Sequence, residues 1–312
     1  MKTCALLGFT ACGISLLLCG CGGGGSKPAA PVVSPLAGNW LIAGPLPTYG
    51  FTPPGTGVFS LVMSFDVTGN NITASGYGSG FCASNSTPPI YNMAFSFSSL
   101  TTGVIAADGS FTLQTPQNTP GYSLSMQGTV PELNTEQFAG TYAASFNSPA
   151  GPPCMGNSSG KFTATSFPLV SGIYNGTANI QSVTNGVLSS PTPITMQVSL
   201  QQGATVLDPT TGLSKPSNIA IGGTIRVQGF PCFTSGTANT TPLPINGEPL
   251  SSIAGNIVNV SYTMDDGSML NFTGALTDSS ESQILASFSM IPSANCGVDD
   301  VVSPSTDLTR QN

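Results

Sequence analysis

LVMSFDV, residues 61–67, places a large apolar side chain at every second position. A period of two is the pattern of a β-strand that buries one face and exposes the other. The turn residues Gly69-Asn70-Asn71 follow at once, and Asp108-Gly109 stands between two further apolar stretches, which is a strong hairpin signal. The same alternation recurs at residues 93–97, 122–126, 138–146 and 196–200, and no stretch has a helical period. The chain is therefore predicted to be all-β, with antiparallel strands joined by hairpins.

The order of strands and turns repeats in the second half of the chain. Residues 171–174 (SGIY) retrace residues 37–40 (AGNW), residues 229–232 (GFPC) retrace residues 79–82 (SGFC), and residues 270–274 (LNFTG) retrace residues 124–128 (LSMQG). A repeat of this kind indicates two copies of one folding unit. We expect a first β domain at residues 36–168 and a second at residues 169–312, each with roughly six to eight short strands.

Four cysteines lie within these two units, namely Cys82, Cys154, Cys232 and Cys296. Four cysteines can pair in three ways, and their spacing alone does not choose among them. The repeat does choose, because Cys232 takes the place of Cys82 and Cys296 that of Cys154. The bonds Cys82–Cys154 and Cys232–Cys296 are therefore expected. Since the chain has no histidine and no CxxC spacing, neither a metal site nor a cofactor is expected.

The hairpin-rich order favours two tandem antiparallel up-and-down barrels, and immunoglobulin-like β-sandwiches are the alternative. Gly38-Asn39-Trp40 resembles the Gly-x-Trp that opens the first strand of lipocalins, and the resemblance implies a barrel. Lipocalins also have an arginine near the last strand that stacks on this tryptophan, whereas Lys161 is the only basic candidate here. In an immunoglobulin domain the tryptophan lies between two cysteines, whereas Trp40 precedes both.

Residues 1–20 are typical of an export signal, with Lys2 before an apolar run and the small Gly20 before a cut. Cys12-Gly13 interrupts that run, which is too short to span a bilayer. Leu18-Cys19-Gly20-Cys21 resembles the lipobox of bacterial lipoproteins. The resemblance implies that Cys21 becomes the lipidated N-terminus, that residues 21–35 form a Gly/Pro-rich tether and that the membrane is a partner. Gly22, in place of an aspartate, favours the outer membrane or cell surface over the inner membrane.

The composition excludes one class of partner. Charged residues make up 6% of the chain and hydrophobic residues 39%, so solubility depends on uncharged polar side chains. Loss of the leader removes Lys2, one of six basic residues, and the remaining five oppose thirteen acidic ones, for a net charge of −8. Nucleic acid is therefore not expected as a partner, because its binding depends on clustered lysine and arginine.

Catalytic signals are sparse. Without histidine, the usual nucleophilic and acid–base sites cannot form, although paired carboxylates could still hydrolyse glycosides. Four carboxylate pairs are candidates, and each also has a simpler interpretation as part of a turn, a loop or a polar tail: Asp265-Asp266, Glu132 with Glu136, Asp278 with Glu281, and Asp299-Asp300. The first and last of these pairs could instead hold calcium, but neither has the spacing of a calcium loop. The chain is therefore not expected to be an enzyme.

Three functional hypotheses remain, in order of preference. The first is an envelope-anchored, non-catalytic binding module that holds an apolar or carbohydrate ligand inside one or both barrels. The second is a structural or adhesive cell-surface protein with an envelope partner. The third is a carboxylate-dependent hydrolase.

Overall fold

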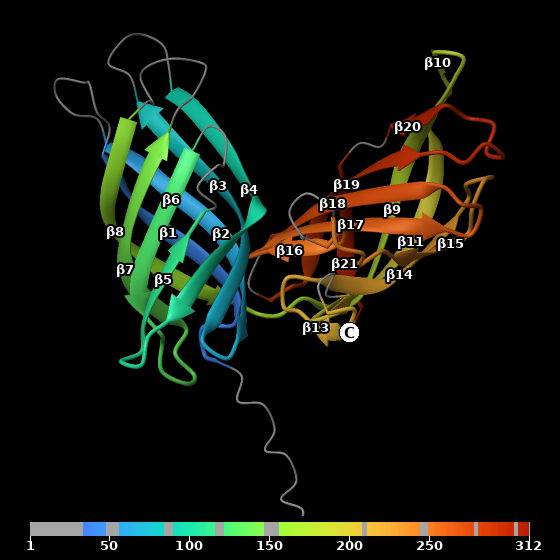
Figure 1. Ribbon diagram of the computed structural model, residues 1–312. Coiled ribbons are helices and arrows are strands. Elements are labelled where there is room, and N and C mark those ends of the chain that lie inside the picture. The colour runs from blue at the N-terminus through green and yellow to red at the C-terminus, as the bar shows by residue number, and fades with distance from the viewer. Residues whose placement is uncertain are drawn as a thin grey trace, which may run out of the picture. The chain divides into compact units, whose positions relative to one another are not determined.

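The computed structural model describes nine ranges of the chain, and every regular element in them is a β-strand (Figure 1). The ranges are 34–47, 56–83, 90–115, 122–146, 156–207, 211–243, 249–277, 280–302 and 305–311. No helical segment with the length and hydropathy needed to span a bilayer occurs in these ranges. The all-β prediction is confirmed. The predicted lipidation site, Cys21, lies outside the described residues.

The first eight strands form a closed antiparallel barrel in which each strand pairs with the next along the chain, and β1 pairs with β8 (Figure 1). The up-and-down barrel is thus confirmed, and the sandwich alternative is wrong. The Asp108-Gly109 hairpin is found between β4 and β5, where Gly109 has a φ of +82°. The strands are β1 (Gly38–Pro47), β2 (Thr56–Thr68), β3 (Asn71–Ala83), β4 (Ile90–Ile105), β5 (Ser110–Gln114), β6 (Tyr122–Thr129), β7 (Gln137–Phe146) and β8 (Gly156–Phe167).

The second barrel repeats this order with short strands added outside the ring (Figure 1). Its ring closes because β20 and β21 share the last place and both pair with β9. The ring consists of β9 (Ser171–Thr184), β11 (Thr192–Gln202), β14 (Ile221–Gln228), β15 (Ser235–Ala238), β17 (Ile257–Met264), β18 (Met269–Leu276), β19 (Gln283–Ile291), β20 (Asp300–Val302) and β21 (Thr306–Arg310). The added strands are β10 (Val187–Leu188), β12 (Thr205–Leu207), β13 (Ser214–Pro216) and β16 (Ser252–Ala254).

The sequence repeat corresponds to equal places in the two rings. LSMQG lies on β6 and LNFTG on β18, which is the sixth strand of each barrel. The glycines that open the first strands, Gly38 and Gly172, both have positive φ values, +130° and +141°. Both barrels belong to one compact unit, Val33–Asn312, so the division into two domains at residues 168 and 169 stays a prediction.

The alternating apolar residues that the structure describes form one hydrophobic core in each barrel. In the first barrel, Phe138 lies among three aromatic rings, edge-to-face with Trp40, Phe111 and Phe162 at centroid distances of 4.7, 5.8 and 5.9 Å. Packed side chains likewise fill the second interior, around Tyr174, Tyr262 and other buried residues. The side chains of residues 79–100, on parts of β3 and β4, lie outside what the structure describes, and the internal ligand cavity of the binding hypothesis stays a prediction.

One of the two expected disulfides is present. Cys232 and Cys296 are bonded, which ties the segment after β14 to the segment after β19. Phe230 and Phe233 flank Cys232 and pack on each other in the core, with ring centroids 4.7 Å apart. The Cys82–Cys154 pairing lies outside what the structure describes.

Candidate functional site

An open groove of about 620 Å³ lies on the outer face of the second barrel. Four adjacent strands carry it, in the order β21, β9, β11 and β14. Because neighbouring strands lie about 4.8 Å apart, the groove extends about 14 Å from the first of these strands to the last.

The strand register arranges the side chains of the groove in two rows. Thr309 pairs with Asn175, Asn175 with Gln197, and Gln197 with Arg226, so one residue from each strand forms the first row. Two residues along each strand, the second row consists of Asp307, Thr177, Thr195 and Gln228. All eight side chains lie on the outer face, because the residues between them face the core.

The floor of the groove is set by close packing at the seam between β9 and β21. A Cβ added at Gly176 would lie 2.5 Å from Leu308 Cδ2 and 2.7 Å from the Asp307 carbonyl oxygen. Only glycine allows β21 to approach β9 so closely. The buried Met196 completes the floor.

The two charged residues of the groove stand at opposite corners. Arg226 is on β14 and in the first row, and Asp307 is on β21 and in the second. Both are exposed, and within the described ranges neither side chain has a recorded hydrogen bond or ion pair. The only contact recorded between side chains of the eight is a long one, 3.5 Å, from Thr195 Oγ1 to Gln228 Oε1. The polar groups of the groove are thus available to a ligand.

The first barrel uses the equivalent face for an internal contact. By register, Leu41, Val62 and Tyr77 occupy the places of Asn175, Gln197 and Arg226. The tight turn between β16 and β17 lies on this face: Gly255 N donates to Ser64 Oγ at 3.0 Å, and Asn259 Nδ2 donates to Tyr77 Oη at 2.8 Å.

Gly255 fits this face closely. Its φ is +58°, and an added Cβ would lie 2.6 Å from Val62 Cβ. This face of the fold therefore accepts an occupant at very short range.

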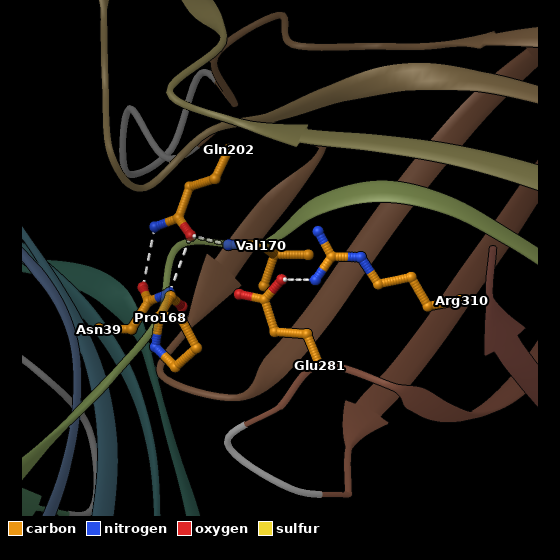
Figure 2. Close-up of polar contacts among 6 residues, drawn as sticks. All are labelled: Asn39, Pro168, Val170, Gln202, Glu281 and Arg310. Carbon is orange, nitrogen blue, oxygen red and sulfur yellow. Dashed lines mark hydrogen bonds and ion pairs between the residues drawn. The ribbon is translucent and has the colours of Figure 1, made fainter. Parts of the chain in front are cut away.

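A buried amide pair joins the two barrels at the connecting segment, as Figure 2 shows. Asn39 Nδ2 donates to Gln202 Oε1 and Gln202 Nε2 donates to Asn39 Oδ1, both at 2.8 Å. Asn39 also donates to the Pro168 carbonyl oxygen, and Gln202 accepts from Val170 N. The exposed fractions of Asn39 and Gln202 are 1% and 8%, so the pair fixes the connection and is not a ligand site.

The buried Glu281 accepts a hydrogen bond from Arg310 Nη1 at 2.9 Å, in the only salt bridge recorded among the described residues (Figure 2). Desolvation raises the pKa of Glu281 above its usual value, although Arg310 opposes that effect. Burial, followed by the charge of Glu281, raises the pKa of the neighbouring Tyr174 to about 12.

Arg310 of the last strand also pairs beside Tyr174, the counterpart of Trp40. The same place in the first barrel holds Ser166, which pairs with Trp40, so Lys161 is not the counterpart of Arg310.

The structure does not bring the predicted carboxylate pairs together as a site. Asp265 accepts hydrogen bonds from Thr234 and Ser235, and Asp266 accepts them from Ser268 and Ser293. The hydrogen bond from the Thr234 hydroxyl is the main cause that lowers the pKa of Asp265, against a smaller effect of desolvation. At Asp266 desolvation is the largest single effect and raises the pKa, but the hydrogen bonds from Ser268 and Ser293 together outweigh it and leave the pKa lowered. Both residues therefore stabilise turns.

The other predicted carboxylates also lie outside the groove. Asp299 accepts from Asn185 N, and Asp300 begins β20 beside it. Glu132 and Glu136 are exposed between β6 and β7, and Asp278 lies outside the described residues. Among the residues that the structure describes, no three potential metal ligands are grouped.

Sequence reasoning missed the groove. Residues 306–310 (TDLTR) have the alternation of a strand, and Arg226 stands between Ile225 and Val227 in the same pattern. The alternation alone could have placed Asp307, Thr309 and Arg226 on outward faces, but not beside one another.

No family model and no curated protein matches this chain. Two solved structures are similar over most of its length. A protein from Nitrosomonas europaea provisionally named AttH is 8% identical, with 87% of this chain and 91% of that one covered, at a TM-score of 0.22. Kievitone hydratase from Nectria haematococca is 9% identical, with 88% and 90% covered, at a TM-score of 0.21.

The second of these similarities corrects one prediction. The chain was expected not to be an enzyme, yet kievitone hydratase is one, so that expectation does not stand. Likenesses of this size carry no activity over to this chain.

Proposed function

We propose that this chain is an envelope-anchored binding protein, held by lipid on Cys21, and that its second barrel binds a carbohydrate in the outer groove. The observation that carries the proposal is the double row of eight outward polar side chains across four strands.

The chemistry of the rows favours a sugar over an apolar ligand. Amide side chains both donate and accept hydrogen bonds, and so do hydroxyl groups, which matches a ligand covered with hydroxyls. An apolar molecule would cover Asn175, Gln197 and Gln228 without giving them partners, which costs free energy.

The first barrel supports the choice of face. There the equivalent residues are partly apolar and receive the turn at Gly255. In the second barrel, three of these places hold Asn175, Gln197 and Arg226 instead. In the second barrel this face is an open groove lined by polar side chains.

The proposal is tested by screening the full chain against a glycan array and measuring the hits by titration calorimetry. We expect Thr309→Ala and Gln197→Ala to weaken binding several-fold each, because each removes a hydrogen bond to the ligand. Thr165→Ala is the matched control, because Thr165 is the exposed counterpart of Thr309 on the first barrel and must leave binding unchanged. Equal effects of Thr309→Ala and Thr165→Ala would refute the groove as the site.

A structural or adhesive role is the second candidate, favoured by Val187 and Leu188 on the β10 hairpin. Their exposed fractions are 69% and 55%. If this role holds, Val187→Ser with Leu188→Ser abolishes self-association or surface adhesion and leaves glycan binding intact.

A further inference from the structure

Arg226 is the residue of the groove that most narrows the choice of ligand. The other described arginine, Arg310, is already paired with Glu281. Arg226 is exposed at mid-strand on β14, with Gln197 opposite it and Gln228 two residues away on the same face. No carboxylate of the described ranges is recorded as its partner. A guanidinium group in such a place is a free two-pronged donor.

The first barrel shows what this place in the fold does. Tyr77 holds the place of Arg226 there, and its hydroxyl accepts the hydrogen bond from Asn259 that ties the occupant to the face. The side chain at this place therefore reaches outward to whatever covers the sheet. A phenol at this place accepts a hydrogen bond from a neutral donor, whereas a guanidinium group at the same place can bind an anion.

The charges of the groove define which anion fits. A carboxylate matches the planar fork of one guanidinium group with two parallel hydrogen bonds. A phosphate dianion would leave negative charge uncompensated, because the groove has one cation, also contains Asp307, and belongs to a chain with thirteen acidic residues. A carboxylate monoanion is neutralised by Arg226 alone.

Asp307 fixes the orientation of the ligand. Its corner lies three strands and one row from Arg226, roughly 16 Å away by strand geometry. Its carboxylate accepts hydrogen bonds from hydroxyls and repels a second anion. The acidic end of a ligand therefore lies over β14 and its uncharged end over β21.

We propose that the groove selects a carboxylate-bearing glycan, an oligosaccharide with a single uronic acid at one end, and that Arg226 binds its carboxylate. This inference rests on the proposed carbohydrate function and names its substrate class. Arg226 acts as the specificity-determining residue, and the amide and hydroxyl rows hold the sugar rings.

The test compares two forms of one ligand on the full chain by titration calorimetry: an oligosaccharide with one terminal uronate, and the same oligosaccharide with that carboxyl group reduced to a hydroxymethyl group. We expect the wild-type chain to bind the uronate roughly ten- to a hundred-fold more tightly, which is the range for a hydrogen bond to a charged group. Arg226→Gln should abolish that preference, so that the variant binds the two forms with equal affinity. Arg226→Lys should retain part of the preference for the uronate form. A higher salt concentration should weaken the binding of the uronate form and leave that of the reduced form unchanged.

The outcomes separate the two proposals. If the wild-type chain binds both forms equally, or binds a sulfated or phosphorylated oligosaccharide more tightly than the uronate, the inference about Arg226 is wrong and the carbohydrate function stands. If neither form binds and the array shows no hit, both proposals fail. Circular dichroism of the Arg226 variants verifies folding, and because the side chain is exposed we expect no change.

Discussion

Replacement of Asn39 by alanine removes few atoms, but it should lower the free energy of unfolding far more than their number suggests. The Asn39 amide donates to Pro168 O and Gln202 Oε1 and accepts from Ser64 Oγ and Gln202 Nε2. The substitution removes all four hydrogen bonds, each worth about 1 kcal/mol net. Gln202 keeps Val170 N and the Asn218 carbonyl oxygen as partners, but the buried Ser64 hydroxyl loses its acceptor.

The expected loss of unfolding free energy from the four hydrogen bonds is about 3–4 kcal/mol. Urea denaturation with linear extrapolation measures it. Asn175→Ala is the control, because this half-buried asparagine lies on the outer face of β9 and its replacement should change stability by no more than about 0.5 kcal/mol. In a double-mutant cycle, the variant with both Asn39→Ala and Gln202→Ala should lose clearly less unfolding free energy than the two single variants lose in sum. The reason is that the two side chains share two hydrogen bonds, which each single substitution already removes. Strict additivity, or a loss below 1 kcal/mol for Asn39→Ala, would refute the reasoning.

Three further predictions concern the barrels themselves. Cys232→Ser with Cys296→Ser should lower the unfolding free energy by about 4 kcal/mol in urea, because the bond closes a long loop in the unfolded chain; no change would contradict the entropic argument. Phe138→Ala should cost about 3–5 kcal/mol by the same assay, and Phe138→Leu, which retains most of the volume, distinctly less. The pKa of Glu281 is raised in the folded state, so the folded chain binds a proton at higher pH than the unfolded chain does. Stability should therefore fall as pH rises from about 4.5 through that higher pKa, and Glu281→Gln should flatten this part of the curve; a curve unchanged by the substitution would show that another group is responsible.

The strand order could be predicted from the sequence because the evidence for it is local. Alternation such as LVMSFDV, turn pairs such as Asp108-Gly109 and the repeat of AGNW as SGIY each depend on a few neighbouring residues. The Cys232–Cys296 bond followed from the repeat, since only one pairing keeps each bond within its own copy at equivalent places.

The groove could not be predicted because it depends on pairing between distant residues. Asn175 and Thr309 are 134 residues apart in sequence and become neighbours only when β21 closes the ring. Outward polar residues on a strand have the same pattern whether they meet solvent or a ligand. Only the register shows that four of them form one row.

The duplication itself argues that the polar face is more than a solvated surface. The chain obtains its solubility from small hydroxyl side chains and has only six basic residues in 312. On the second barrel no turn is described over this face, and serine or threonine would have sufficed to keep it soluble. Instead, Leu41, Val62 and Tyr77 correspond to Asn175, Gln197 and Arg226, which are long, hydrogen-bonding side chains set side by side on three adjacent strands. Side chains of that length lose rotamer freedom when they are ordered, and such a set suits a ligand that repays the loss with hydrogen bonds.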